Sequence, residues 1–250
     1  PLNKNIYGFL YVIFLFFLFF YIILWLNLST FNNKEMFTSI LKKVLMALSG
    51  IFLMIFLMQH LAINLTSLLP DGGSTFNKIS HFMGYNPVVQ FVLQPILMFG
   101  VCFHFTMGVF LDYQNKKARK SKYVYHNTRS SWISKNMIIT GLVVLAFLLL
   151  HFYDFWLPEM DYKYISQLLP AEDRYFHELQ EKFHNTYRTI IYCISFILLG
   201  LHLNHGLASS FQSVGVSSTR QKTLKIIANI YSLFISIGFT TVAIFHHFSH

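Results

Sequence analysis

The chain has 250 residues, of which 54% are hydrophobic and 12% are charged, and phenylalanine alone occurs 28 times. This composition excludes an ordinary soluble domain and indicates a membrane protein, because about 20 consecutive apolar residues of helix cross a hydrocarbon core about 30 Å thick. The formal net charge of +9 does not predict a nucleic-acid partner, because no soluble segment carries a groove-reading or base-stacking motif.

Six apolar and nearly charge-free segments have the length of a membrane-spanning helix. They cover about residues 6–28, 43–66, 88–111, 137–157, 189–211 and 225–246. None shows the ten-residue alternation that is typical of a membrane β-barrel. The sequence therefore predicts an all-α integral membrane helical bundle of five core transmembrane helices, with one additional apolar segment at the N-terminus.

The N-terminal segment, residues 1–35, has two interpretations. It contains an unbroken apolar run at 9–26, while the chain begins with Pro1 and its first methionine is Met36. The segment is either a real extra span or an extension that lies upstream of the true start or is removed after targeting. We favour the second interpretation, because every candidate functional residue follows Met36, and we treat residues 36–250 as the functional domain.

Charged residues divide the connecting regions into two groups. Basic residues gather in the regions 29–43, 112–135 and 212–225. Most of the acidic residues lie in the other connections, at Asp71, Glu159, Asp161, Glu172, Asp173, Glu178 and Glu181. The positive-inside rule places the basic regions in the cytoplasm and the C-terminus on the outer side. There the basic residues can also contact anionic lipid or a cytoplasmic partner.

Four histidines lie in four different spans: His60, His104, His151 and His202. An ionisable side chain inside a membrane span is costly, which makes each of them a functional candidate. With a helical rise of 1.5 Å per residue, His60 and His151 both lie roughly 24–25 Å from the cytoplasmic ends of their helices. His104 lies roughly 12 Å from its cytoplasmic end, and His202 also belongs to the inner half.

The matched depths of these histidines favour a ligand role. One buried histidine is more often a hydrogen-bonded polar group than a ligand. Two pairs at matched depths instead predict axial ligands for two stacked haem irons, with His60 opposite His151 and His104 opposite His202. We predict no catalytic residue in the chain.

The fourth ligand has a competitor. His205 lies three residues after His202, but we prefer His202 because it lies deeper and, like His104, has a glycine four residues later, Gly206 or Gly108. Such glycines would allow a flat macrocycle to approach the helix closely, and they also serve helix–helix packing.

The two cysteines and the three histidines at the C-terminal end give weaker signals. Cys102 and Cys193 lie in apolar spans and form no C-x-x-C-H motif, so any haem would be bound non-covalently. His246, His247 and His250 gather at the C-terminal end. A metal site is conceivable there, but a solvated chain end is the favoured interpretation.

Four segments around the paired histidines resemble the cytochrome b subunit of succinate dehydrogenase and fumarate reductase. They are FLMQHLAIN at 56–64, FHFTMGVF at 103–110, LLLHFYDFW at 148–156 and LHLNHGLASSFQSVG at 201–215. The resemblance is to the single-anchor form with five spans and two haems b, as in menaquinone-using bacteria, and it covers about residues 36–250. It implies His60 and His151 at a distal haem, and His104 and His202 at a proximal haem.

The resemblance implies a membrane anchor of respiratory complex II in a bacterial inner membrane, which passes electrons between an iron–sulfur subunit and a quinone, with menaquinone as the expected quinone. A flavoprotein and an iron–sulfur subunit would dock on the cytoplasmic face, because this chain has no flavin motif and no cluster cysteines. Some dihaem members have a glutamate two residues before the last ligand in a proton path. Gly200 occupies that position here, which argues against such a path.

Two rival functions remain open. The first is a dihaem cytochrome b that anchors a hydrogenase or a formate dehydrogenase and would bind a different soluble partner. The second is a proton-coupled transporter that uses the histidines as a relay. Transporters usually show broken helices or inverted repeats, and the sequence shows neither.

The quinone site has three candidate residues near the expected distal haem. A quinone takes up two protons with its two electrons, so its site needs a protonatable group and access to water. His81 in the first outer connection, and Asp154 and Glu159 in the sequence DFWLPE, meet this requirement.

Overall fold

The computed structural model describes residues 39–118, 137–216 and 220–249, and these residues form helices without any strand. Five helices among them are long and apolar enough to cross a membrane. The main helices of these five spans are α2 (Ser39–Leu65), α4 (Gln94–Ala118), α6 (Met137–His151), α9 (Thr186–Ser213) and α10 (Gln221–Phe248). The predicted all-α bundle of five core spans is confirmed, and residues 1–35 lie outside the described residues.

Two of the spans include π-helical turns, which are frequent at functional sites. The turn η2 (Val89–Leu93) leads directly into α4. Helix α6 continues through η3 (Phe152–Trp156), α7 (Leu157–Met160) and η4 (Asp161–Ile165). The first of these turns follows His151 immediately, so the helical register changes just beyond a candidate ligand.

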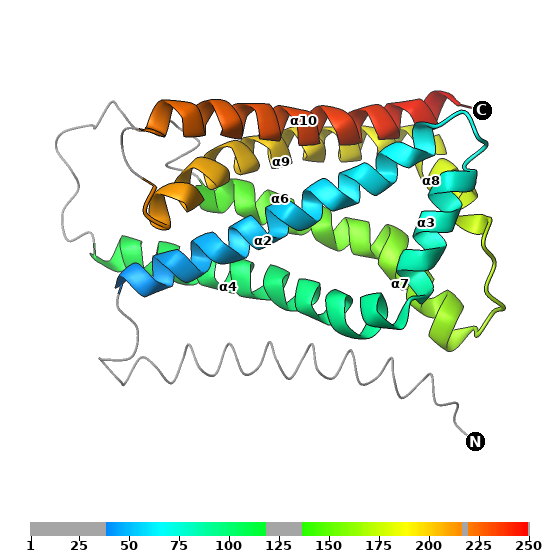
Figure 1. The fold of residues 1–250 in the computed structure, drawn as a ribbon, viewed down its shortest axis with the longest axis horizontal. Helices are drawn as coiled ribbons and strands as arrows, with labels where there is room; N and C mark the ends of the chain where they lie inside the picture. The colour runs from blue at the N-terminus through cyan, green and yellow to red at the C-terminus, as the bar shows by residue number, and fades with distance from the viewer. Residues whose placement is uncertain (1–38, 119–136, 217–219, 250) are drawn as a thin grey trace, which may run out of the picture.

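Successive spans run in opposite directions through the bundle (Figure 1). Helices α2 and α10 begin, and α4 and α9 end, at one end of the bundle, which we call the inner end. Lys42, Lys116 and Lys222 lie there, whereas Asp71 and Glu172 lie at the opposite, outer end. The described residues therefore separate the charges as the sequence predicts, and the chain is a multi-pass membrane protein.

The outer end is covered by short elements: η1 (Thr66–Leu68), α3 (Ser74–Tyr85) and α8 (Arg174–His184). Hydrogen bonds from the Thr75 side chain and backbone to Asp71 fix the start of α3 and lower the pKa of that carboxyl. Asn77 joins α3 to α8, because its side chain donates to the Asp173 carbonyl at 3.0 Å and accepts from the Phe176 N–H at 2.8 Å.

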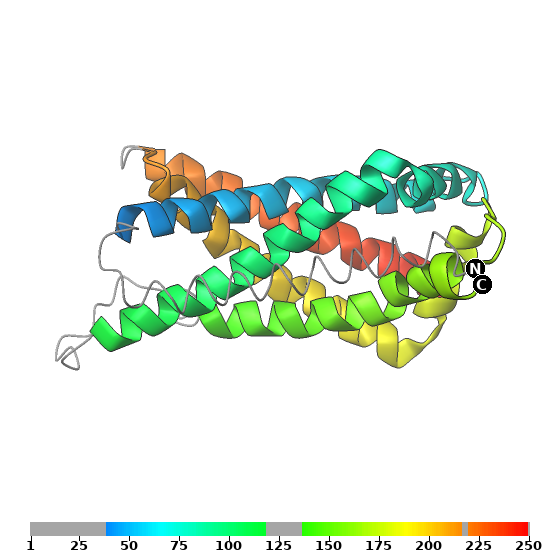
Figure 2. The same ribbon diagram turned by 90° about the horizontal axis from the view of Figure 1, so that it is seen from below.

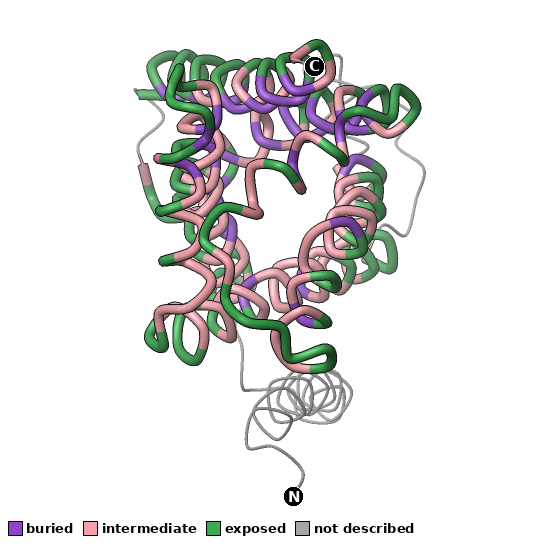
Figure 3. Tube along the Cα trace, turned by 90° about the vertical axis from the view of Figure 1, so that its right-hand side faces the viewer, coloured by how far each residue is buried: buried purple, intermediate pink, exposed green. Residues whose placement is uncertain are grey.

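The packing of the bundle is uneven around its axis. Helix α4 crosses α2 obliquely (Figure 2), while α9 and α10 run side by side in close contact. Buried residues concentrate on α9 and α10 (Figure 3), where Ile235 and Ala243 have no exposed surface. Many outward-facing side chains are apolar and exposed, such as Ile55, Leu149 and Ile237, as expected for helices that face lipid.

Polar contacts between spans are few and specific. The Tyr231 hydroxyl donates to the Met54 carbonyl at 2.7 Å and joins α10 to α2. Asn204 donates to the side chains of Asn229 and Ser232 and joins α9 to α10. In lipid the hydrophobic effect does not drive helices together, so association depends on van der Waals packing and on interhelical hydrogen bonds such as these.

Single-cysteine labelling tests the arrangement of the two ends. In a background with Cys102→Ala and Cys193→Ala, we expect a membrane-impermeant thiol reagent to label Glu172→Cys in intact cells. We expect Lys222→Cys to react only after permeabilisation, because the two positions lie at opposite ends of the bundle. Labelling of both positions from the same side would contradict the five-span arrangement, and the reverse pattern would invert the predicted orientation.

Candidate functional site

The structure brings His60 of α2 and His151 of α6 together in the interior of the bundle. Their ring centroids are 5.8 Å apart, with an interplanar angle of 80°. A metal–imidazole bond is about 2 Å long and each ring centre lies roughly 1 Å behind its nitrogen, so two rings that share one metal have centroids about 6 Å apart. The observed separation fits a shared metal ion.

An apolar cavity of about 460 Å³ opens beside this pair. His60 and His151 line it together with Phe56, Phe147 and Phe239. The Phe56 ring stacks on His60 at 5.6 Å, and the Phe147 ring lies 6.0 Å from His151. Its size and apolar lining are those of a site for a cofactor or small molecule, and neither imidazole has a hydrogen-bond partner among the described residues.

The second predicted pair lies nearer the inner end. His104 of α4 and His202 of α9 each contact a residue that lies eleven positions before an outer histidine on α2 or α6, so both rings lie nearer the inner end than His60 and His151. Each ring has a hydroxyl partner on a neighbouring span: Ser49 Oγ lies 3.0 Å from His104 Nδ1, and Thr140 Oγ1 lies 3.1 Å from His202 Nδ1. The four histidines thus form an outer pair, His60 with His151, and an inner pair, His104 with His202.

Glycines next to these hydroxyl residues make room for the inner rings. A Cβ atom on Gly50 would lie 3.3 Å from His104 Cε1, and one on Gly141 would lie 3.4 Å from His202 Cε1. The glycines four residues after His104 and His202 face methionine methyl groups instead: a Cβ atom on Gly108 would lie 3.4 Å from Met46 Cε, and one on Gly206 would lie 3.5 Å from Met137 Cε.

Other glycines near the histidines serve helix packing. A Cβ atom on Gly100 would lie 2.6 Å from a Phe52 ring atom, and one on Gly200 would lie 3.0 Å from Ser236 Cβ. These two positions let α4 approach α2 and let α9 approach α10. At Gly200 even a Cβ atom is closer to Ser236 than an ordinary contact, so a larger residue there would require α9 and α10 to shift apart.

The predicted solvated chain end is wrong for His246, which packs inside the outer end of the bundle, and His247 also makes a structural contact. The His246 ring is fully buried, with Nε2 2.8 Å from Ser67 Oγ, and His247 Nδ1 lies 2.8 Å from the Phe183 carbonyl oxygen. Within the described part of the chain, no group of three or more histidine, cysteine, aspartate or glutamate side chains could hold a metal ion. His250 lies outside that part.

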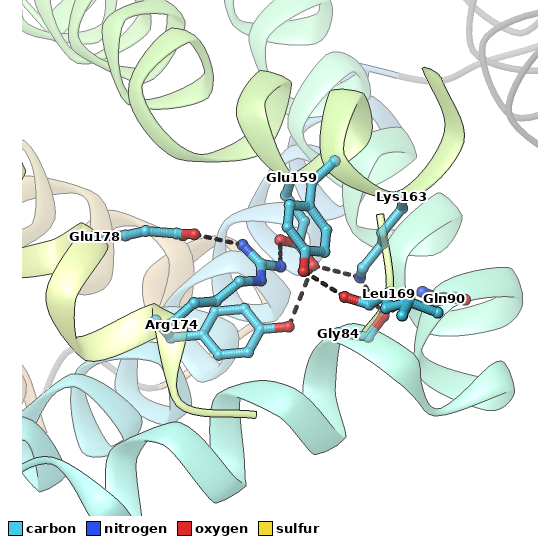
Figure 4. Close-up of polar contacts among 9 residues, drawn as sticks. Gly84, Gln90, Glu159, Lys163, Leu169, Arg174 and Glu178 are labelled. Atoms are coloured by element: carbon cyan, nitrogen blue, oxygen red, sulfur yellow. Dashed lines mark hydrogen bonds and ion pairs between the residues drawn. The ribbon is translucent and has the colours of Figure 1, made fainter. Parts of the chain in front are cut away.

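At the outer end the cavity reaches a group of charged side chains (Figure 4). Glu159 lines the cavity and pairs with both Lys163, at 2.5 Å, and Arg174. Arg174 also pairs with Glu178 at 2.7 Å. The side chains of Glu159, Lys163 and Arg174 are only 17%, 6% and 12% exposed, so the group is largely shielded from water. We call these four residues the outer charge cluster.

Several polar atoms near this cluster have no hydrogen-bond partner among the residues that the structure describes. They are Trp156 Nε1, Tyr85 Oη, Arg174 Nε and His81 Nδ1, all of them buried. Burial, followed by the charge of Glu159, raises the pKa of Tyr85 and of Tyr175, so both phenols remain donors. Because buried donors are normally satisfied, and Trp156 lines the cavity, these atoms fit a ligand that carries acceptor oxygens.

The three quinone candidates lie at different places relative to the cavity. Glu159 lines it directly. His81 does not line it; its ring stacks on Tyr85 at 4.5 Å and Nε2 lies 3.9 Å from Glu172. Asp154 is buried, only 2% exposed, and is not part of the cavity lining. It accepts a hydrogen bond of 2.8 Å from Tyr192, which does line the cavity.

Asp154 belongs to a chain of polar contacts that reaches toward the surface. Arg188, on α9, has a nitrogen 3.4 Å from Asp154 Oδ1, and its side chain is 30% exposed. Tyr192, one turn further along α9, lies against His151 with ring centroids 6.4 Å apart. A buried carboxylate is therefore held between a cation at the bundle surface and a phenol beside the outer histidine pair.

The sequence analysis missed Ser49, Gly50, Thr140 and Gly141. A signal for them was present, because α2 and α6 share the pattern Met-x-x-[Ser/Thr]-Gly followed ten residues later by histidine. The outer charge cluster was missed as a unit, because the contact between Glu159 and Arg174 depends on how α8 docks against the helical turns before it. Comparisons with family profiles, curated proteins and solved structures found no match to this chain.

The contact between Tyr192 and Asp154 gives a stability prediction. Tyr192→Phe keeps the ring but removes a hydrogen bond to a buried carboxylate, which should lower the free energy of unfolding by about 1–3 kcal/mol. Thermal unfolding in detergent measures the effect. Tyr187→Phe is the matched control, because Tyr187 is 81% exposed on the same helix. An equal change in the two variants would contradict the role assigned to this contact.

Proposed function

We propose that this chain is a dihaem cytochrome b membrane anchor of a succinate:quinone oxidoreductase, respiratory complex II. The observation that carries the proposal is the pairing of His60 with His151 across 5.8 Å beside a cavity of about 460 Å³. His104 and His202, which we assign as a second pair, both lie nearer the inner end. Haem b bound at the two levels would supply one-electron transfer across the bundle.

The residues around the outer pair are suited to hold a flat, apolar group. Phe56 stacks on His60 with its ring tilted by only 13°, and Phe155 lies 5.2 Å from His151. Leu199 and Val242 add aliphatic lining from α9 and α10. These side chains exclude water from the imidazoles, and burial is one of the means by which a protein sets the potential of a bound metal centre.

The quinone would bind at the outer end of the same cavity, where Glu159, Trp156 and Tyr175 meet. Trp156 has a buried indole N–H without a partner, which can donate to a quinone oxygen. Glu159 provides a carboxylate that can take up or release a proton as the quinone changes its redox state. The resemblance to anchors of menaquinone-using bacteria makes menaquinone the expected form.

The soluble partners would bind at the inner end. Lys42, Lys116 and Lys117 lie there, on the side of the inner histidine pair. A flavoprotein and an iron–sulfur subunit at this surface would be close to His104 and His202. The rival anchor of a hydrogenase or a formate dehydrogenase shares the haem chemistry and is distinguished by the subunit that copurifies with the chain.

Substitution of the ligands tests the haem proposal. His60→Ala and His151→Ala should lose the same haem, or turn it high-spin, while the other haem is disturbed less, because each iron needs both imidazoles of its pair. His104→Ala and His202→Ala should share a second phenotype. Haem titration and low-temperature reduced-minus-oxidised spectra of the purified variants measure both outcomes.

His205→Ala is the control for these variants, and it should retain two haems. Loss of a haem in this variant, with both haems intact in His202→Ala, would overturn the choice of the fourth ligand. Two intact low-spin haems in His60→Ala would overturn the pairing itself. If the wild-type chain has no b-type spectrum, both cytochrome functions fail and the transporter becomes the stronger reading.

Substitution of the quinone candidates tests the outer site. Glu159→Gln should slow quinone turnover at least several-fold while the haem content stays normal, because it removes a protonatable group from the cavity lining. His81→Asn should turn over like the wild type, because His81 lies outside the cavity lining. Normal turnover in Glu159→Gln and in Asp154→Asn would place the quinone elsewhere, near the inner pair.

A further inference from the structure

The same hydroxyl–imidazole contact occurs twice in the inner half of the bundle. Ser49 Oγ lies 2.8 Å from the Met46 carbonyl oxygen and 3.0 Å from His104 Nδ1. Thr140 Oγ1 lies 2.9 Å from the Met137 carbonyl oxygen and 3.1 Å from His202 Nδ1. In both cases one hydroxyl lies between a backbone carbonyl of its own helix and a histidine of another span.

The polarity of these contacts follows from counting hydrogens. A hydroxyl has a single hydrogen, and a carbonyl oxygen can only accept. Ser49 satisfies both of its contacts at once only if it donates to the Met46 carbonyl and accepts from an N–H at His104 Nδ1. By the same count, Thr140 donates to the Met137 carbonyl and accepts from an N–H at His202 Nδ1. A neutral imidazole with its proton on Nδ1 has its lone pair on Nε2, which is the atom then available to a metal.

The two contacts belong to an internal repeat. Met137, Thr140, Gly141 and His151 follow Met46, Ser49, Gly50 and His60 by the same interval of 91 residues. His202 and Gly206 likewise follow His104 and Gly108 by 98 residues. The glycine after each hydroxyl faces Cε1 of the same imidazole. Two different pairs of helices therefore build one arrangement around the inner rings.

We propose that Ser49 and Thr140 are positioning residues, which hold His104 and His202 with the proton on Nδ1 so that both Nε2 atoms are preset as ligands of one metal centre. The inference rests on the proposed function, because the metal centre is the inner haem. It assigns a role to the two hydroxyls alone: the outer pair, His60 and His151, has no equivalent hydrogen bond among the described residues.

The expected consequence is specific to the inner haem. A hydrogen bond that accepts the Nδ1 proton raises the basicity of the coordinating imidazole and fixes its orientation, and removing such a partner typically weakens metal affinity about 10- to 100-fold. A less basic ligand favours the reduced iron. Loss of either hydroxyl should therefore raise the reduction potential of the inner haem and change its spectrum, while the outer haem stays as it was.

The experiment compares Ser49→Ala and Thr140→Ala with the wild type in the full chain, purified with whatever subunits it retains. The readouts are haem bound per polypeptide, the low-temperature spectrum and a redox titration that resolves two haems. Thr106→Ala and Ser195→Ala are the matched controls. Their hydroxyls donate to carbonyls one turn earlier, at 2.7 and 2.8 Å, but contact no histidine.

The inference predicts a higher potential and easier loss of one haem in both alanine variants, and wild-type values in both controls. Ser49→Thr and Thr140→Ser keep the hydroxyl and should have the wild-type spectrum. They keep the test decisive even if an alanine variant loses both haems. The inference is overturned if the alanine variants titrate like the wild type, or if Ser49→Thr is as defective as Ser49→Ala. A wild-type chain without b-type haem overturns the proposed function together with this inference.

Discussion

A neutral imidazole carries one N–H donor and one acceptor nitrogen, and leaving either unpaired is costly where water is excluded. In the tautomer that we infer for the inner half of this bundle, Ser49 or Thr140 accepts the donor hydrogen of each ring, so that only the acceptor nitrogen is left. At the outer level neither imidazole has a hydrogen-bond partner among the described residues, and His60 and His151 face a cavity among aromatic rings. The centre of the bundle is arranged around the nitrogens that remain.

The internal repeat explains why the histidines come in pairs at the same depth. Helices α2 and α6 both run outward, and α4 and α9 both run inward, so the two halves are related in parallel rather than inverted (Figure 1). A parallel repeat places equivalent residues at equal depth on facing helices, whereas an inverted repeat would place them at opposite depths. Helix α10 has no counterpart in the repeat and packs along α9.

The spans and the outer histidine pair could be predicted because both depend on length alone. An apolar run of about 20 residues is long enough to cross a bilayer, and a fixed rise per residue converts sequence position into depth. The roles of the glycines were harder to predict. Gly100 and Gly200 turned out to serve helix packing, while Gly50 and Gly141 face the imidazoles, and only the rotation of each helix about its axis separates these roles.

The outer end could be predicted least, because its features depend on tertiary contacts between separate segments. Helices α3 and α8 lie in connections too polar to be read as spans, and it is their docking that brings Arg174 against Glu159. Asn77 fixes that docking through two hydrogen bonds to the start of α8. A single sequence contains the charges but not the distances between them.

The composition of the outer charge cluster bears on how a neutral ligand could enter. Two cations, Lys163 and Arg174, face two carboxylates, Glu159 and Glu178, so the formal charges of the cluster balance. A shielded ion-pair group of this kind contributes little net stability, because desolvation offsets most of the attraction. Under the proposed function, this balance would let an uncharged quinone approach without meeting an excess charge. Uptake of a proton by the Glu159 carboxylate would then leave the cluster with one positive charge, beside the two cations that already contact Glu159.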